Sequence, residues 1–324
     1  MNIILFGESP SAHFLSQNLL ELENVSRVFH YGASPKVYSS TRYHPLFTLE
    51  KDIEKFILEL PLKYHFDLIV PMGLKYQLWS DFRKIMLDTG IPILLPDERL
   101  INLIGCQSSI KKILTDADLP YRSDIEVNNK FSFYAICNNK SWAHLGTVKN
   151  YKDIKFCSPF KDYDDVVSKY VQQIFTLLKL NNYNTRFILK VELALDSNNN
   201  VVILKLDTSL DNEFLTICSL VKNNLADILY NAGADIEFPK IEFKNNGSVS
   251  LKIVTKTRIK SQAEEFPQLW PVTGNVTVSL NNPPLSLHSI VSSCDENIDL
   301  ARNNIYNFLK NKPMGNYTYI EQII

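Results

Sequence analysis

Residues 2–13 have the sequence NIILFGESPSAH. A short apolar run is followed by a turn-forming segment, and apolar residues then recur at helical spacing. This order predicts a buried strand at residues 2–6, a turn at 7–10 and a helix at 11–22. A strand that leads directly into a helix is typical of a parallel sheet, so this stretch already indicates an α/β fold.

Strands and helices continue to alternate through the first 120 residues. Apolar runs and helical periodicity predict further strands at residues 26–31, 66–70 and 92–95, and helices at 49–60, 76–89, 98–104 and 108–117. Strands joined through helices lie parallel to one another. We therefore expect a doubly wound parallel α/β domain over residues 1–120.

The candidate binding residues of this domain follow its strands, because ligands of such sheets bind at the carboxyl ends of the strands. They are Gly7, Ser9, Ser11, His13 and Lys75. Free N–H groups at the start of the first helix would favour a phosphate, and the serine hydroxyls would add donors. The alternative stays open that Ser9 only caps the helix, His13 packs on its face and Lys75 is solvated.

From residue 121 to 324 the pattern is α+β. It predicts strands at residues 131–137, 186–195, 201–206, 249–256, 285–291 and 317–320, and helices at 160–180, 210–232 and 297–309. The strands at 186–195 and 201–206 flank the turn-forming run Ser197-Asn198-Asn199-Asn200, which indicates an antiparallel hairpin.

Composition excludes several classes of protein. The 324 residues include only 10 glycines, so several glycine-rich phosphate loops are not expected. The formal net charge of -1 predicts no general attraction to nucleic acid or to an anionic membrane. The five cysteines lack metal-binding or redox spacing, and residues 1–6 are too short for a signal-peptide core, which predicts a cytoplasmic protein.

The order of these elements, together with several short motifs, resembles phosphoribosylamine-glycine ligase, an ATP-grasp ligase of purine biosynthesis. The family pattern G-x-G-G-R-E-H-A keeps Gly7, Ala12 and His13 here, and the proline of the family's G-P-E-x-P-L turn is Pro71. The runs at residues 90–96 and 119–121 continue the likeness. The resemblance implies a pre-ATP-grasp N-terminal sheet followed by a truncated ATP-grasp-like α+β domain.

Departures from the family concern its ATP site. The resemblance places Gln107 where a lysine near ATP is expected, and it leaves only residues 122–130 for the subdomain that covers the nucleotide. The two magnesium ligands correspond to Leu204 and Leu206. Leucine offers magnesium no oxygen ligand, so no metal site is predicted.

The charged residues around this strand leave two questions open. Lys205 and Asp207 each follow one of these leucines by one residue. We therefore expect them on the face of the strand opposite the leucines, unless the register of the strand shifts. Asp211 and Glu213 match a family D-P-E motif near the substrates, which makes them candidate substrate-binding residues. The alternative is solvated charge ahead of a helix.

Three functions remain in competition. The first is a divergent family member linked to purine biosynthesis, without normal Mg-ATP-dependent activity, that acts as a pseudoenzyme or partner protein. The second is an active ligase with a nonstandard or partner-supplied ATP site, the only case that requires ATP and Mg. The third is a module that binds or senses a small phosphorylated ligand. The expected partners are accordingly a purine-biosynthesis enzyme or that ligand.

Overall fold

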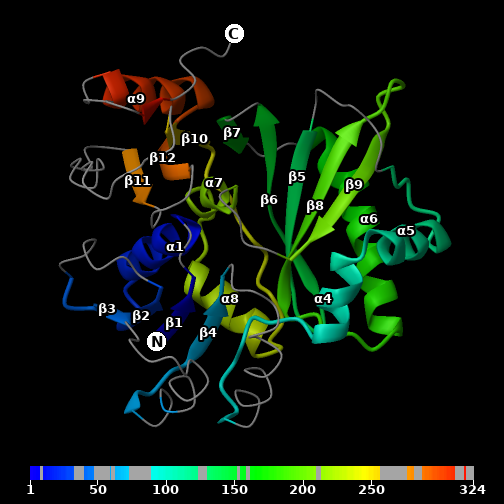
Figure 1. Ribbon diagram of the computed structural model, residues 1–324, viewed down its shortest axis with the longest axis horizontal. Coiled ribbons are helices and arrows are strands. Elements are labelled where there is room, and N and C mark those ends of the chain that lie inside the picture. The colour runs from blue at the N-terminus through cyan, green and yellow to red at the C-terminus, as the bar shows by residue number, and fades with distance from the viewer. Residues whose placement is uncertain are drawn as a thin grey trace.

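The computed structural model describes residues 1–7, 10–32, 40–46, 59, 63–72, 89–122, 130–151, 154–157, 161–208, 213–255, 276–280, 287–310 and 317–318. These residues form two sheets with helices packed between and beside them (Figure 1). One sheet is small and parallel, and the other is large and antiparallel. The α/β and α+β character predicted for the two parts of the chain is thereby confirmed.

The small sheet has the strand order β3-β2-β1-β4. Its strands are β1 (Asn2–Phe6), β2 (Arg27–Tyr31), β3 (Tyr43–Leu46) and β4 (Leu68–Pro71). Ile3 and Leu5 point into a core shared with α1 (Pro10–Glu21) and α8 (Leu225–Gly233), whereas Ile4 and Phe6 enter a second cluster on the other face. β1 is therefore buried on both sides, as its uninterrupted apolar run predicted.

Double winding of this sheet stays a prediction. The helices expected at residues 49–60 and 76–89 lie outside the described residues except for Glu59 and Thr89. The strand expected at residues 92–95 is reduced to a single parallel bridge between Ile69 and Ile93. β3, in contrast, was not expected, because four residues that include a proline carry little strand signal.

The large sheet has the order β11-β12-β10-β7-β6-β5-β8-β9, and β13 pairs with β10. Its strands are β5 (Lys130–Cys137), β6 (Trp142–Tyr151), β7 (Ile154–Cys157), β8 (Phe187–Leu195), β9 (Val201–Asp207), β10 (Gly247–Thr255), β11 (Val276–Leu280), β12 (Leu287–Asp295) and β13 (Tyr317–Thr318). The predicted hairpin of β8 and β9 is confirmed. β6, β7 and β11 were missed.

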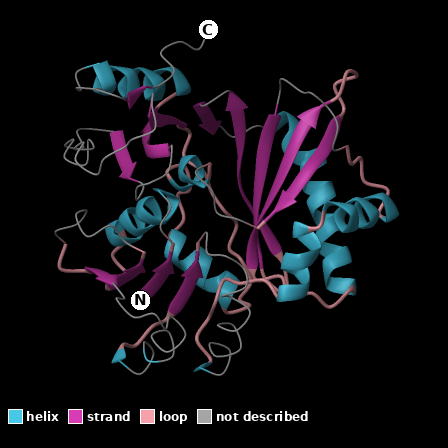
Figure 2. Cartoon of the chain, viewed as in Figure 1, coloured by secondary structure: helices cyan, strands magenta, loops and turns pink. Residues whose placement is uncertain are grey.

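Helices cover the two faces of the large sheet differently. On one face α4 (Glu98–Gly105), α5 (Gln107–Asp116) and α6 (Lys161–Leu180) bury a cluster with β5, β8 and β9 (Figure 2). On the other face α7 (Phe214–Cys218) and α8 fill the space toward the small sheet. α9 (Ile298–Lys310) packs against β10 and β12.

The single helix predicted at residues 210–232 is wrong, because α7 and α8 are separate. Asn224 adopts an extended conformation, and its side chain accepts hydrogen bonds from the backbone N–H groups of Ala226 and Asp227. α7 has already ended at Cys218, and the Asn224 N-cap starts a new helix. The break allows α8 to turn onto the small sheet. A helix that lies beyond residue 120 thus completes the core formed by the first 120 residues. The boundary predicted at residue 120 stays a prediction.

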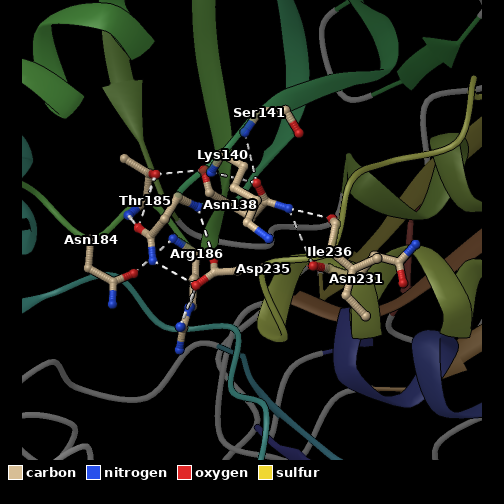
Figure 3. A network of polar contacts seen from close by, with 10 residues as sticks. Asn138, Lys140, Ser141, Asn184, Thr185, Arg186, Asn231, Asp235 and Ile236 are labelled. Atoms are coloured by element: carbon tan, nitrogen blue, oxygen red, sulfur yellow. Dashed lines mark hydrogen bonds and ion pairs between the residues drawn. The ribbon is translucent and has the colours of Figure 1, made fainter.

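A polar network fastens α8 to the large sheet (Figure 3). Asp235 accepts hydrogen bonds from Arg186 Nε at 3.0 Å and Nη2 at 2.5 Å, and from the backbone and side-chain N–H groups of Asn139 at 3.0 Å each. Asn138 donates to the carbonyl of Ile236 at 2.6 Å. Burial raises the pKa of Asp235, but the donors from Arg186 and Asn139 and the Arg186 charge outweigh it, and its net pKa is lowered.

Loss of the Asp235 charge should therefore destabilise the fold. We expect Asp235→Asn to lower the free energy of unfolding by about 1–3 kcal/mol, because Arg186 keeps its charge in a partly buried place without a counter-ion. Urea denaturation measures the change. The matched control is Asp299→Asn, whose side chain is 76% exposed and pairs with Arg302, and which should cost no more than about 0.5 kcal/mol. Equal losses in both variants would contradict the role assigned to this network.

Candidate functional site

The carboxyl ends of β1, β2 and β4 meet as predicted. Phe6 pairs with Tyr31 on one side and with Pro71 on the other. The N–H of Gly7 donates to the carbonyl of Tyr31 at 3.0 Å. A Cβ on Gly7 would lie 2.3 Å from the carbonyl oxygen of Met72. Gly7 is therefore required by close backbone packing at this edge, whatever the edge binds.

The other residues predicted at this edge are inside the protein or outside its described part. Ser11 is fully buried, and His13 is 1% exposed. Within the described residues, neither ring nitrogen of His13 has a hydrogen-bond partner. Ser9 and Lys75 lie outside the described residues. A phosphate site formed by these side chains stays a prediction.

A second histidine packs against His13. The ring of His30 lies 4.9 Å from that of His13, its Nε2 is 2.8 Å from the carbonyl of Gly7, and its Nδ1 is 2.9 Å from the hydroxyl of Tyr43. Since a carbonyl only accepts, Nε2 carries the proton and Tyr43 donates to Nδ1. Burial lowers the pKa of His13 to about 3, with a contribution from His30, and burial lowers that of His30 to about 4. Both rings are neutral at pH 7 and offer no positive charge to an anion.

The second candidate site lies on the β8–β9 hairpin and depends on an irregularity of register. Leu193 pairs with Ile203, but its neighbour Glu192 pairs with Lys205, so Leu204 has no partner on β8. This is a β-bulge, in which one strand carries an extra residue. Side chains alternate between the two faces of a strand. After the extra residue, each side chain of β9 therefore points to the face opposite the one it would otherwise take.

The bulge corrects the placement expected for Lys205 and Asp207. Lys205 is opposite Glu192, and Asp207 is opposite Lys190. Directly opposed residues share a face, so these four charged side chains lie together on the face turned away from α6. Leu206 instead belongs to the core cluster with α4, α5 and α6. The register shift that the sequence left open is present.

We call Lys190, Glu192, Lys205, Asp207 and Glu213 the lysine–carboxylate cluster. Lys190 Nζ lies 3.1 Å from Glu192 Oε1 and 3.3 Å from Glu213 Oε2, and Lys205 Nζ lies 2.7 Å from Asp207 Oδ2. The side chains of Lys190 and Glu213 are only 5% and 9% exposed. The hydrogen bond to Asp207 raises the pKa of Lys205, helped by the charges of Asp207 and Glu192. Each carboxylate thus faces an ammonium group.

The hydroxyl of Tyr134 extends the cluster toward β5. It donates to Glu213 Oε2 at 3.4 Å, and Lys190 Nζ lies 5.9 Å from the centre of the Tyr134 ring. Glu213, one of the two acidic residues predicted from the family motif, is therefore a buried member of the cluster. Asp211 lies outside the described residues. Lys190 and Glu192 were missed, although two charges two residues apart in an otherwise apolar strand mark a polar patch on one face.

A cavity of about 360 Å³ adjoins the cluster at the outer edge of β9. The end of α4, the start of α5 and β9 contribute most of its lining residues. The structure brings Gln107, Leu204 and Leu206, the three positions assigned to the ATP site by resemblance, into this one cavity. Its lining consists of Ile104, Gly105, Gln107, Ile110, Tyr121, Lys130, Glu192, Leu204, Lys205 and Leu206.

Little chain is available to cover this cavity from the position of the family's lid. The carbonyl of Pro120 accepts from the N–H of Ile203 at 2.7 Å, and the N–H of Arg122 donates to the carbonyl of Ile203 at 2.9 Å. The chain next enters the sheet at Lys130 in β5, two strands away. Crossing two strands already takes about 10 Å. The segment between residues 122 and 130 is therefore too short to form a subdomain.

The residues of this site do not fit a divalent cation. Magnesium binds several oxygen ligands in octahedral geometry. In the part of the chain that the structure describes, no group of three or more His, Cys, Asp and Glu side chains is placed to hold a metal ion. The carboxylates of the cluster are engaged by Lys190 and Lys205 instead. A metal ion would have to displace Lys190 or Lys205 from these carboxylates before it could bind them.

The buried histidines predict acid sensitivity. Their pKa is about 3 to 4 in the folded chain against the usual 6.5, so the unfolded state binds more protons as the pH falls below 6.5. Their contribution is complete above pH 6.5 and is lost toward pH 4, by up to about 1.4 kcal/mol per pH unit for each ring. Urea denaturation at a series of pH values in this range gives the free energy of unfolding as a function of pH. This free energy should fall less steeply with falling pH for His13→Gln than for the wild type. The exposed control His65→Gln should keep the wild-type slope, and an unchanged slope in His13→Gln would refute the assignment.

No protein-family model matches the chain, and no curated protein matches it. Solved structures do match. A biotin carboxylase from Campylobacter jejuni, in a β,γ-ATP complex, has a TM-score of 0.71 at 11% identity over 98% of this chain and 92% of that one. The bicarbonate-bound biotin carboxylase domain of a thermophilic 2-oxoglutarate carboxylase has a TM-score of 0.69 at 12% identity over 99% and 91%.

A third similar structure comes from a much longer protein. The K. lactis urea amidolyase has a TM-score of 0.67 at 14% identity, over 95% of this chain and 20% of that one. In the described part of the present chain, no helix is long and apolar enough to span a membrane. The sequence identities to these solved structures, 11% to 14%, establish the fold and not the phosphoribosylamine-glycine ligase family. The chain therefore has the ATP-grasp-like fold of biotin carboxylase domains.

Proposed function

We propose that this chain is an ATP-grasp-like pseudoenzyme, a binding or partner protein that does not carry out ordinary Mg-ATP-dependent ligation. The observation that carries the proposal is the pairing of every carboxylate in the lysine–carboxylate cluster with an ammonium group. Its link to purine biosynthesis rests on the sequence resemblance alone, and a cytoplasmic location rests on the cysteine spacing and the N-terminal residues.

The ion pairs of the cluster oppose phosphoryl transfer from Mg-ATP, because they engage the carboxylates that would hold its metal ion. Such transfer relies on metal ions that bridge the phosphates and neutralise the charge that develops. Lys190 is held between two carboxylates and is nearly inaccessible, so it cannot swing into solvent to release them. Removing it from this place would leave the buried carboxylate of Glu213 without a counter-ion, which costs several kcal/mol. The resting arrangement is therefore stable as it stands.

The short segment between residues 122 and 130 supports the same proposal. Ligases of activated carboxylates must keep water away from the reactive intermediate, and closing segments commonly do this. Here the chain passes from Arg122 at the edge of β9 to Lys130 in β5 without room for a covering subdomain. An intermediate formed at the edge of β9 would have no such subdomain to shield it from water.

The proposal predicts that the protein releases no ADP. Purified protein incubated with phosphoribosylamine, glycine and Mg-ATP should give no more ADP than Lys190→Met prepared in the same way, because any shared background then comes from a contaminant. A coupled ADP assay measures the rate, and an active ATP-grasp ligase tested in parallel shows that the assay works. Turnover by the wild type at about 1 s⁻¹ or faster, a rate ordinary for enzymes, and absent from Lys190→Met, would contradict the proposal.

A further inference from the structure

We propose that the groove between the β5–β6 turn and the C-terminal half of α6 docks an acidic segment of a partner protein. Trp142, Phe175 and Leu180 contact one apolar side chain of that segment, and Lys140 and Lys179 pair with the acidic residues beside it. The inference names a kind of partner for the proposed function and rests on it for the partner role. The groove lies on the α6 face of the large sheet, opposite the lysine–carboxylate cluster.

The groove has the volume of a small binding site. It measures about 570 Å³, within the range of about 300–1,000 Å³ that is usual for sites of small ligands. Residues 140–142, in the turn and at the start of β6, contribute part of its lining. Side chains of α6 between Gln172 and Leu180 contribute the rest of the described lining. A space of this size admits a few side chains of a bound segment, not a folded surface.

Hydrogen bonds fix the turn and the helix before anything binds. The backbone N–H of Lys140 donates to Asn138 Oδ1 at 2.9 Å, which holds the turn in shape (Figure 3). Trp142 Nε1 donates to Gln172 Oε1 at 2.8 Å. Lys179 Nζ donates to the carbonyl of Lys140 at 3.3 Å. Because the turn and the helix are joined at two places, a bound segment need not order them, which reduces the entropy cost of binding.

Leu180 provides exposed apolar surface in the groove. Its exposure of 74% is the highest among the large apolar side chains of the described residues. Phe175 belongs to the core cluster beneath α6, and Trp142 packs against that cluster, so both rings are held in place. An apolar side chain that docks against these three residues loses contact with water, which favours binding.

The described lining carries positive charge only. Lys140 and Lys179 belong to it, and no carboxylate is among the described residues that line the groove. Within the described part of the chain neither lysine enters an ion pair, and Lys179 Nζ instead lies 5.4 Å from the centre of the Phe175 ring and donates to the Lys140 carbonyl. An ammonium has three N–H donors, so this bond leaves donors for a ligand. Carboxylates of a bound segment would supply the counter-ions that the groove lacks.

The end of α6 does not require the ammonium of Lys179. This lysine is in the last turn of the helix, where a positive charge can compensate carbonyl groups without partners. Those carbonyls are already bonded. Leu177 accepts from the backbone and side-chain N–H groups of Asn181 at 3.1 and 2.8 Å, and Leu178 accepts from the N–H of Tyr183 at 3.0 Å. The charge therefore remains available to a partner.

The same features do not suit nucleic acid. Nucleic acid binds where many lysines and arginines neutralise phosphates, and single-stranded bases stack on exposed aromatic rings. Here the described lining has two lysines, and the rings of Phe175 and Trp142 lie in or against the core. The exposed apolar group is the aliphatic Leu180. A leucine or phenylalanine flanked by aspartates or glutamates matches both the apolar and the charged parts of the groove.

Fluorescence anisotropy tests the inference with a short labelled peptide that carries Leu-Phe between two runs of aspartate. We expect a dissociation constant of about 10–100 μM in low salt, because a groove for a few side chains buries less area than a standard interface. A peptide with asparagine for aspartate, and one with serine for Leu-Phe, should each bind about tenfold more weakly or worse. Equal binding of the asparagine peptide, or no binding of the acidic peptide at about 1 mM, would overturn the inference.

Variants of exposed side chains locate the binding. Lys140→Glu, Lys179→Glu and Leu180→Ser should each weaken binding of the acidic peptide about fivefold or more. The matched control is Lys310→Glu, the same charge change at an exposed position in the last turn of α9, which should bind like the wild type. Thermal unfolding verifies that each variant folds. Unchanged binding in both Lys140→Glu and Lys179→Glu would refute the site.

A signal from within the groove gives a second readout. In the NMR spectrum of ¹⁵N-tryptophan-labelled protein, the indole N–H signal of Trp142 is the one that is absent from Trp142→Phe. It should shift as the acidic peptide is added, and it should stay in place when the asparagine peptide is added. A Trp142 signal that does not move while the acidic peptide binds would place the peptide elsewhere and refute the inference.

Sedimentation distinguishes a partner protein from a second copy of this chain. We expect the wild type and Leu180→Ser to have the same oligomeric state. A dimer that dissociates in Leu180→Ser would show that the groove holds another copy, and it would overturn the assignment to a partner.

The two proposals can fail separately. If the wild type releases ADP while the acidic peptide binds in the groove, the proposed function is refuted and the docking site stands. If no ADP is released and the acidic peptide does not bind, the proposed function stands and the docking site is refuted.

Discussion

The site depends on one extra residue in β9. Without the bulge at Leu204, Leu204 and Leu206 would face Glu192 and Lys190, and the charged side chains Lys205 and Asp207 would enter an apolar core. Burying two charged groups there would cost far more than the local loss of sheet pairing. The bulge therefore lets the strand keep an apolar side against α4, α5 and α6 and a charged side on the other face. The cluster follows from that separation.

The cluster in turn gives the fold an unusual electrostatic character. In an ATP-grasp-like fold the corresponding face is expected to hold metal ions and phosphates, but here two lysine side chains of the same chain form ion pairs with the carboxylates. The buried Lys190 links β8 to Glu213 and, through Tyr134, to β5. Each of the three carboxylates thus has a lysine of the same chain beside it. On the proposed function, the ATP-grasp-like fold is retained and these carboxylates no longer hold the cation that drives phosphoryl transfer.

Local patterns predicted much of the fold. The uninterrupted apolar run of β1, the periodicity of α6 and the asparagine-rich turn between β8 and β9 all gave correct elements. β6 was missed because its mixture of aromatic, polar and glycine residues shows neither period. The bulge could not be foreseen, since the sequence lists its residues in order and only pairing with β8 shows which one is extra. The packing of α8 on the small sheet likewise depends on contacts across more than 150 residues of chain.

The most direct test of the account is the position of metal ions in crystals soaked with MnCl₂, located by anomalous scattering. The account predicts no manganese at the lysine–carboxylate cluster, with Lys205 Nζ remaining beside Asp207 and Lys190 Nζ between Glu192 and Glu213. A manganese ion coordinated by Glu192 and Asp207, with Lys205 turned away, would contradict it. That result would show that the lysines yield to a metal and that the site keeps the chemistry of its fold.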